Sequence, residues 1–332
     1  MRFEPGEDAA ALREAAAALL SAQSTPAVIR AGWPGGSIDT VRGVWQRLAE
    51  TGVVATLVPE ANDGLGLDEN CLVPLFEEIG RSGLPVPAVE TIALAAPMLA
   101  AAGDSRLGGV LSGELLVAAT LRGGDLVAFG QNADLVLLGD HHGGVLYDRK
   151  DLELEPLETI DGSRAVARVV SRRGGVPLGN AGAVSAAWQR GVLGTSALLC
   201  GLAGTMLDLT VGYVKTREQF GVPIGSFQAI KHHLASALLA LQFARPAVAA
   251  AGWALAEGES SAVDDVSTAK VLASDAAKLV ARTAIQCHGA IAYTTEYDLH
   301  LYAKRVWALA PSWGDAAWHR DQLAISLGLK EL

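Results

Sequence analysis

The sequence predicts a mostly α-helical protein in which a small β domain separates two helical regions. Helix-type periodicity dominates residues 1–112, and short β-like runs separated by Gly and Asp occupy 113–175. Long apolar helical stretches with short connections follow over 176–332. We therefore expect an N-terminal helical domain (1–112), a reduced middle β domain (113–175) and a C-terminal helical bundle (176–332).

The first region contains several stretches typical of helices. Ala9–Ser21 consists almost entirely of strong helix formers. Ser37–Glu50 opens with a possible Ser37 N-cap and repeats apolar residues at helical spacing. Asp68–Arg81 has the same periodicity, and Ala88–Ala102 is expected to form a further apolar helix.

The middle region predicts a small antiparallel β domain, because its short apolar runs are bounded by turn residues. The expected strands are Val117–Leu121, Leu126–Phe129, Ala133–Leu138, Gly144–Asp148 and Ala165–Ser171.

The last region predicts an up-and-down helical bundle that forms the core of an oligomer. Its first stretch, Ala181–Arg217, contains no proline and is long enough for about ten helical turns. The further expected helices are Ser226–Glu257, Ala262–His288, Thr295–Ala310 and Gly314–Leu327.

Composition excludes several classes of function. The net charge is -10 and no long basic run is present, so a nucleic-acid partner is not expected. The N-terminus lacks a signal-peptide pattern, and charged or glycine residues interrupt the apolar segments, so we expect a cytoplasmic protein without a membrane span. The three cysteines lie far apart and the histidine pairs lack metal-ligand spacing, so no metal site is expected.

Four ordered motifs resemble the signatures of the acyl-CoA dehydrogenase family. The first is Leu48–Gly52 with Val58–Glu60 and Gly64–Leu67, similar to "LAxxG…PExxGGxGL", and Glu77–Arg81 is similar to "EElGr". The third, Tyr213–Gly221 followed by Ile224–Gln228, is close to "YxxxRxQFGxxIxxFQ", and Gln286–Tyr293 resembles "QxxGGxGY". Together they cover nearly the whole chain, which makes the resemblance specific.

The resemblance implies FAD bound at subunit interfaces, with parts of each flavin resting on the neighbouring subunit. Carried over residue by residue, Arg217 would meet the pyrophosphate, where a guanidinium fork suits phosphate oxygens. Gln219 and Phe220 belong to the same motif, and Phe220 would pack near the flavin. Gln228 and Gln286 would bind the nucleotide end, and Gly289 would allow close backbone approach.

The catalytic glutamate of the family has no counterpart in this chain. Acyl-CoA dehydrogenases remove the α proton with a carboxylate, which must lie within hydrogen-bond reach of that carbon. Alignment of the "YEGTxxIxR" motif with 312–320 puts Trp313 at the usual position. The alternative position, on the long bundle helix, falls near Gly191. Neither an indole nor a bare backbone can accept the proton.

The missing features belong to the half-site that a family member builds for its own flavin. The "TExxxGSD" loop of the β domain is reduced here to Thr120, Gly123, Gly124 and Asp125. The nearest substitute carboxylate, Asp315, is interpreted as a first-turn acid of a helix. The motifs that remain belong to the half-site that a subunit contributes to its neighbour.

We therefore hypothesise that the chain is the non-catalytic subunit of an α2β2 acyl-CoA dehydrogenase and shares FAD with a catalytic partner. The resemblance to actinobacterial steroid-degrading enzymes of this kind implies a steroid-derived CoA thioester bound mainly in the partner, with electron-transfer flavoprotein as acceptor. Two alternatives stay open. One is an active homotetramer with an unusual base, Asp315 or His319. The other is a flavin-free scaffold protein of the same fold.

Overall fold

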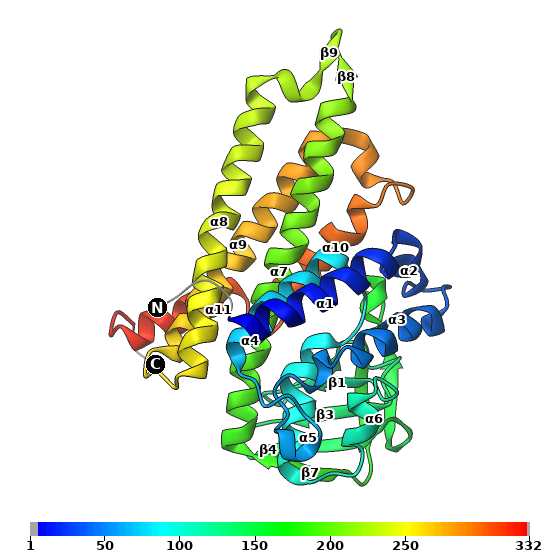
Figure 1. The fold of residues 1–332 in the computed structure, drawn as a ribbon, viewed down its shortest axis with the longest axis vertical. Helices are drawn as coiled ribbons and strands as arrows, with labels where there is room; N and C mark the ends of the chain where they lie inside the picture. The colour runs from blue at the N-terminus through cyan, green and yellow to red at the C-terminus, as the bar shows by residue number, and fades with distance from the viewer. Residues whose placement is uncertain (1–5, 331–332) are drawn as a thin grey trace.

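The computed structural model describes residues 6–330, in which a small β domain lies at one end of a mostly helical molecule (Figure 1). The N-terminal helices are α1 (Glu7–Gln23), α2 (Pro26–Ala31), α3 (Ile38–Glu50), α4 (Glu69–Ser82), a π-helical segment (Val89–Ala95), α5 (Ala96–Ala102) and α6 (Leu107–Leu111). Short 3-10 turns occur at Val53–Ala55, Glu60–Asn62, Arg149–Asp151, Gly162–Arg164, Ile224–Ser226 and Gly289–Tyr293.

The N-terminal helices agree with the sequence prediction except at their ends and at one internal segment. The helix expected over Ala88–Ala102 begins as a π-helix and becomes α-helical only at Ala96. The Ser37 side chain does not cap α3, whereas Asp68 caps α4 by accepting a hydrogen bond from the Asn70 amide at 2.9 Å. The sequence prediction missed two short helices, α2, which Pro26 opens, and α6.

The β domain contains two sheets rather than the five antiparallel strands expected. One sheet has the order β1-β3-β4-β7 and the other β2-β6-β5. The strands are β1 (Val117–Thr120), β2 (Leu126–Val127), β3 (Leu135–Gly139), β4 (Gly143–Asp148), β5 (Leu152–Pro156), β6 (Ala167–Arg172) and β7 (Val176–Asn180).

Two features of these sheets differ from the prediction. The strands β1 and β3 pair in parallel, with Val117 opposite Leu135, so the domain is not purely antiparallel. The chain between them crosses to the second sheet, which brings it back in the same direction. Strands β5 and β7 were missed, because β5 alternates Leu with Glu over a few residues and β7 contains Pro177 and Gly179. Strand β7 lies beyond the predicted domain end at residue 175 and pairs with β4.

The C-terminal bundle has three long helices and two short ones, and its first helix runs from the β domain to the far end of the molecule (Figure 1). They are α7 (Ala181–Thr216), α8 (Gln228–Ala256), α9 (Ala262–His288), α10 (Leu299–Leu309) and α11 (Ala316–Ser326). Helix α9 has the bounds expected from the sequence.

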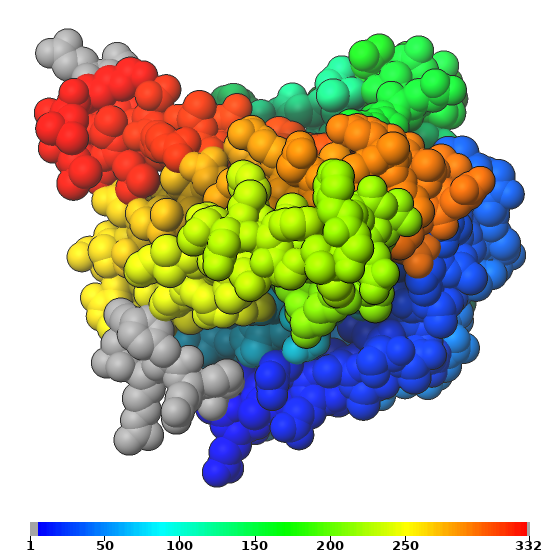
Figure 2. All heavy atoms as spheres, turned by 90° about the horizontal axis from the view of Figure 1, so that it is seen from above, coloured from blue at the N-terminus to red at the C-terminus, as the bar shows by residue number. Residues whose placement is uncertain are grey.

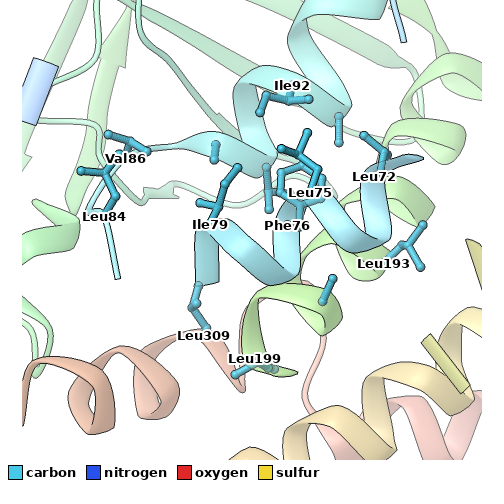
Figure 3. Close-up of a cluster of buried hydrophobic side chains, with 14 of the residues drawn as sticks. Leu72, Leu75, Phe76, Ile79, Leu84, Val86, Ile92, Leu193, Leu199 and Leu309 are labelled. Carbon is cyan, nitrogen blue, oxygen red and sulfur yellow. The ribbon is translucent and has the colours of Figure 1, made fainter. Parts of the chain in front are cut away.

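The N-terminal region packs on α7 through the apolar face of α4. Figure 3 shows this cluster, in which Leu75, Phe76 and Ile79 of α4 lie close to Leu193 and Leu199 of α7. Glycines allow the two backbones to approach. A Cβ on Gly201 would meet the Glu77 carbonyl oxygen at 2.0 Å, and one on Gly80 would meet the Leu198 carbonyl oxygen at 2.3 Å. The helices therefore could not pack this closely with larger residues.

Two helices, Ala181–Thr216 and Gln228–Ala256, are long and apolar enough to cross a membrane by length and composition, a test that buried core helices also pass. In α7 the apolar stretch is 78% buried, as in the core helix of a folded domain. In α8 only 28% of the stretch is buried, so its outer face is open to a partner.

Candidate functional site: an exposed nucleotide end and a closed catalytic end

The hairpin that follows α7 projects from one end of the molecule (Figure 1). Strands β8 (Glu218–Gln219) and β9 (Val222–Pro223) pair in register, so Phe220 and Gly221 form a two-residue turn. Both turn residues have positive φ, 56° and 80°, as two-residue hairpins with the twist of paired strands require. The turn leaves the Phe220 side chain 93% exposed, and its ring makes an edge contact with Phe227. An apolar ring held outward in this way is available to a partner.

Arg217 lies between the end of α7 and this hairpin. Its amide donates to the Tyr213 carbonyl at 2.9 Å, and its own carbonyl accepts from the Ile224 amide at 2.8 Å, so the backbone is held on both sides. The residue is exposed, and within residues 6–330 its guanidinium forms neither a hydrogen bond nor an ion pair. A fixed backbone with a free cationic fork suits the binding of phosphate oxygens.

The C-terminal end of α9 lies beside the hairpin, as Figure 2 shows from above, where the orange segment adjoins the yellow-green one. The Tyr213 ring stacks on His288 with ring centroids 4.3 Å apart, and the Tyr213 hydroxyl donates to the His288 carbonyl at 3.4 Å. The Tyr297 hydroxyl lies 3.1 Å from His288 Nε2. This aromatic group, which sequence reasoning missed, joins the Arg217 segment to the Gln286–Gly289 segment.

The residues predicted to contact the nucleotide are therefore exposed and gathered at one end, here called the hairpin end (Arg217–Gln228 with Gln286–Gly289). Gly289 has φ of 66° and a Cβ there would meet nothing within 4 Å, so glycine is required by conformation rather than by space. The unpaired guanidinium, the exposed amides of Gln228 and Gln286 and the open Gly289 backbone fit the pyrophosphate and adenosine of FAD.

The two positions at which the sequence analysis expected the family's glutamate, Gly191 and Trp313, meet in space. A Cβ on Gly191 would lie 2.9 Å from the indole carbons of Trp313, so the indole rests directly on the glycine backbone. Trp313 has φ of 59°, which is unusual for a bulky residue, and Gly314 follows with φ of 88°. The indole occupies the space that a glutamate at either position would need.

A cationic and aromatic cluster, which sequence reasoning missed, surrounds Trp313. Trp188 of α7 makes edge contacts with Trp313 and Trp318, at centroid distances of 5.5 and 6.2 Å. The Arg122 guanidinium lies 3.9 Å from the Trp188 ring centroid and 4.6 Å from that of Trp318. Such cation–π contacts hold a basic group against Trp188 and Trp318. The tryptophans are visible in the sequence, but their spacing does not place them on one helix, so the sequence did not predict that they form a cluster.

Two buried polar side chains, Lys270 and His319, donate hydrogen bonds to backbone carbonyls of the loop that carries Trp313. Lys270 is fully buried and donates to the carbonyls of Ala310 and Gly314, at 2.7 and 2.8 Å. Burial lowers the pKa of Lys270 to about 7. His319 donates from Nε2 to the Trp313 carbonyl at 3.0 Å and accepts at Nδ1 from the Ser267 hydroxyl at 3.1 Å. Burial lowers the pKa of His319 to about 4, so the ring is neutral.

The two residues considered as unusual bases are both used structurally. The Asp315 carboxylate accepts a hydrogen bond from the Trp318 amide at 2.7 Å and caps α11, as the first-turn interpretation expected. His319 is buried beneath the loop. Neither residue lines the cavity next to Trp313.

That cavity has a volume of about 390 Å³ and lies between the β domain, α7 and the Trp313 loop. Its wall includes Trp188, Trp313, Thr120, Arg164 and one carboxyl-bearing residue, Glu90. Glu90 belongs to the π-helical segment, a type of helix often found at functional sites. Sequence reasoning missed it because a lone Glu in an apolar helix carries no motif.

Metal ligation has no geometric support within residues 6–330, where no three His, Cys, Asp or Glu side chains lie close enough to hold an ion. The three cysteines are free and buried. Burial raises the pKa of the Cys71 thiol to about 11, and burial also raises the pKa of Cys287, which keeps these thiols protonated.

Comparisons with known proteins identify the family of this chain. Residues 6–107 match the model of the acyl-CoA dehydrogenase N-terminal domain and residues 183–328 that of the C-terminal domain. Acyl-CoA dehydrogenase IpdE2 of Mycobacterium tuberculosis is 33% identical over 312 residues, which cover 91% of each chain. A chain of the ChsE4–ChsE5 complex from the same organism is 23% identical with a TM-score of 0.86, covering 100% of both chains. A chain of the Tcur3481–Tcur3483 steroid ACAD is 26% identical with a TM-score of 0.86, covering 98% of this chain and 99% of that one. With its helical order, its β domain and these matches, the chain belongs to the acyl-CoA dehydrogenase family.

Proposed function

We propose that this chain is the non-catalytic subunit of a heteromeric, FAD-dependent acyl-CoA dehydrogenase. In this proposal the hairpin end completes the FAD site of a catalytic partner, and the chain contributes no base. FAD bound in the partner would supply the oxidant for α,β-desaturation of the acyl-CoA. The residues of this chain would bind and orient the nucleotide half of the cofactor.

The observation that carries the proposal is the contact between Trp313 and Gly191. Both positions at which family members place a carboxylate are used to pack an indole on a helix. A single substitution that restores a glutamate at either position would therefore clash or lack its surroundings. We expect Trp313→Glu alone to produce no dehydrogenase activity.

The separation of the two ends supports sharing between subunits. Trp188 lies beside the cavity, and Arg217 follows the other end of the same helix. Arg217 lies 29 positions after Trp188, which corresponds to about 43 Å at about 1.5 Å per residue. This separation supports the proposal that the hairpin end acts on a cofactor whose ring lies in another subunit.

The outer face of α8 supplies a surface for such an assembly. Leu238, Leu239 and Phe243 are 47%, 58% and 66% exposed, an arrangement that is costly for a helix facing water. We propose that partner helices cover this face in an α2β2 heterotetramer. The ChsE4–ChsE5 complex, one chain of which is similar to this chain, supports a heteromeric assembly.

The substrate class and the electron acceptor are further parts of the proposal. The Tcur3481–Tcur3483 relative is a steroid ACAD, which favours a bulky steroid-derived CoA thioester bound mainly in the partner. An electron-transfer flavoprotein would reoxidise the flavin, and the complex would act in the cytoplasm.

Flavin stoichiometry tests the proposal. The chain is purified alone and co-purified with a family member that retains its glutamate, and flavin per chain is measured by absorbance. We expect little flavin alone and about one flavin for every two chains in the complex, as shared sites require. One flavin per chain with turnover of the isolated protein would support an active homotetramer instead. No flavin under either condition would support a scaffold protein.

A further inference from the structure

Tyr213 connects the two segments of the hairpin end. It opens the motif Tyr213–Gly221 and lies in the last turn of α7, four residues before Arg217. Its carbonyl accepts a hydrogen bond from the Arg217 amide at 2.9 Å, and its hydroxyl donates to the His288 carbonyl at 3.4 Å. A single residue therefore contacts both the backbone of Arg217 and the backbone of the residue that precedes Gly289.

The peptide bond between His288 and Gly289 is held at both of its polar atoms. The His288 carbonyl accepts from the Tyr213 hydroxyl, and the Gly289 amide donates to the Ile285 carbonyl. Gly289 has φ of 66° and ψ of -142°, a conformation that glycine adopts far more readily than other residues. Here α9 ends, and here the proposed function places the nucleotide. Fixing this peptide therefore fixes where the segment lies relative to Arg217.

The His288 ring gives Tyr213 a fixed surface to stack on. Its Nδ1 donates to the Ala284 carbonyl at 2.8 Å, because a carbonyl can only accept, and its Nε2 then accepts from the Tyr297 hydroxyl at 3.1 Å. Burial lowers the pKa of His288, which favours this neutral form. The Tyr213 ring lies on the imidazole with centroids 4.3 Å apart and planes at 24°. The imidazole cannot turn away from Tyr213 without losing hydrogen bonds at a buried position.

We propose that Tyr213 is a positioning residue of the shared nucleotide site. Its ring and its hydroxyl set the spacing between Arg217 and the Gln286–Gly289 segment, and both must meet the same FAD molecule. Tyr213 acts through these two segments rather than by touching the cofactor. The inference rests on the proposed function and deepens it, because it names the residue that keeps the two segments of the hairpin end at a fixed separation.

Two substitutions separate the ring from the hydroxyl. FAD affinity is measured by equilibrium dialysis on the complex of this chain with a family member that retains its glutamate. Tyr213→Leu removes both the stack and the hydroxyl and should weaken FAD binding by about tenfold. Tyr213→Phe keeps the stack and should stay within about threefold of wild type. Tyr147→Leu is the stability control, in the β domain at the opposite end (Figure 1), and should lower the unfolding temperature without changing FAD affinity.

A double-mutant cycle tests whether Tyr213 acts through Arg217. The loss of FAD affinity in the double variant Tyr213→Leu, Arg217→Ala should be smaller than the product of the two single losses. Losses that multiply would overturn the proposal, because they would show that the two residues act independently. An equal loss in Tyr147→Leu, or unchanged affinity in Tyr213→Leu while Arg217→Ala loses flavin, would also overturn it.

The stack is checked in the isolated full-length chain, where no flavin is needed. The ring current of Tyr213 should shift the His288 ring-proton resonance in NMR spectra, and Tyr213→Leu but not Tyr213→Phe should abolish that shift. Absence of the shift in the wild-type chain overturns the positioning role and leaves the proposed function standing. Full flavin retention in Arg217→Ala, with the shift present, overturns the proposed function and this inference with it.

Discussion

The indole of Trp313 lies directly on the backbone of Gly191, so the two positions at which the sequence analysis expected a catalytic carboxylate are in contact. The two residues are 122 positions apart, from 191 to 313. The indole fits against the helix because residue 191 has no side chain. The contact has consequences for stability as well as for catalysis.

Gly191→Ala is expected to destabilise the chain by about 1–3 kcal/mol, because the new Cβ would lie 2.9 Å from the indole. The matched control is Gly212→Ala in the same helix, where a Cβ meets nothing within 4 Å. That substitution should stabilise by about 0.5–1 kcal/mol through helix propensity. Urea denaturation measures both. Equal stabilisation by the two substitutions would show that Trp313 does not pack on Gly191.

Stability should fall on acidification through the titration of His319. Its pKa is about 4 in the folded chain and 6.5 when unperturbed, so the unfolded chain takes up the proton first. The stabilisation is complete above pH 6.5 and is lost as the pH falls from 6.5 toward 4. Denaturation midpoints across this range measure the slope. His319→Gln, whose amide can still donate to the Trp313 carbonyl, should have a smaller slope. An unchanged slope would show that His319 does not carry the effect.

Arg305→Met should destabilise the chain by about 3–5 kcal/mol, because it leaves the fully buried Asp161 carboxylate without its cation. The pair joins α10 to the β domain, so loss of the ion pair should weaken the packing between these two parts. Arg168→Met removes the exposed ion pair with Glu155 in the same domain and should cost less than about 1 kcal/mol. Thermal unfolding distinguishes them, and similar costs for the two would contradict the assigned role of the buried pair.

Arg217→Ala should lower the flavin affinity of the complex by about one to two decades, because charge-assisted contacts contribute roughly 1.5–3 kcal/mol. Flavin content and activity should fall together and recover with excess FAD. Lys215→Ala, at an exposed position two residues earlier, serves as the control for charge alone. Full flavin occupancy of the Arg217→Ala complex at low free FAD would rule out the shared site.

Phe220→Ala should affect the complex and not the isolated chain. The side chain is 93% exposed, so its removal should change the unfolding free energy by less than about 0.5 kcal/mol. In the complex it should weaken retention of flavin, measured by absorbance after dialysis. If the substitution lowers the stability of the isolated chain and leaves flavin retention intact, Phe220 is a local structural residue.

Much of the fold could be predicted because its signals are local. The periodicity of α9 and the capping residue of α4 lie within their own segments, and so does the proline that opens α2, although the prediction missed it. The strands β5 and β7 could not be predicted from the residues of their own segments. Their pairing depends on β6 and β4, which supply the hydrogen bonds from elsewhere in the chain.

The sequence by itself determined that no carboxylate stands at either expected position and that the nucleotide motif is present, since both are matters of residue identity. Only the tertiary structure decided that Trp313 and Gly191 are in contact, that Arg122 lies over Trp188, and that Glu90 faces a cavity rather than the core. These relations join residues far apart in the chain. They arise from packing, which depends on the shapes of all the neighbouring side chains and not on the pattern within any one segment.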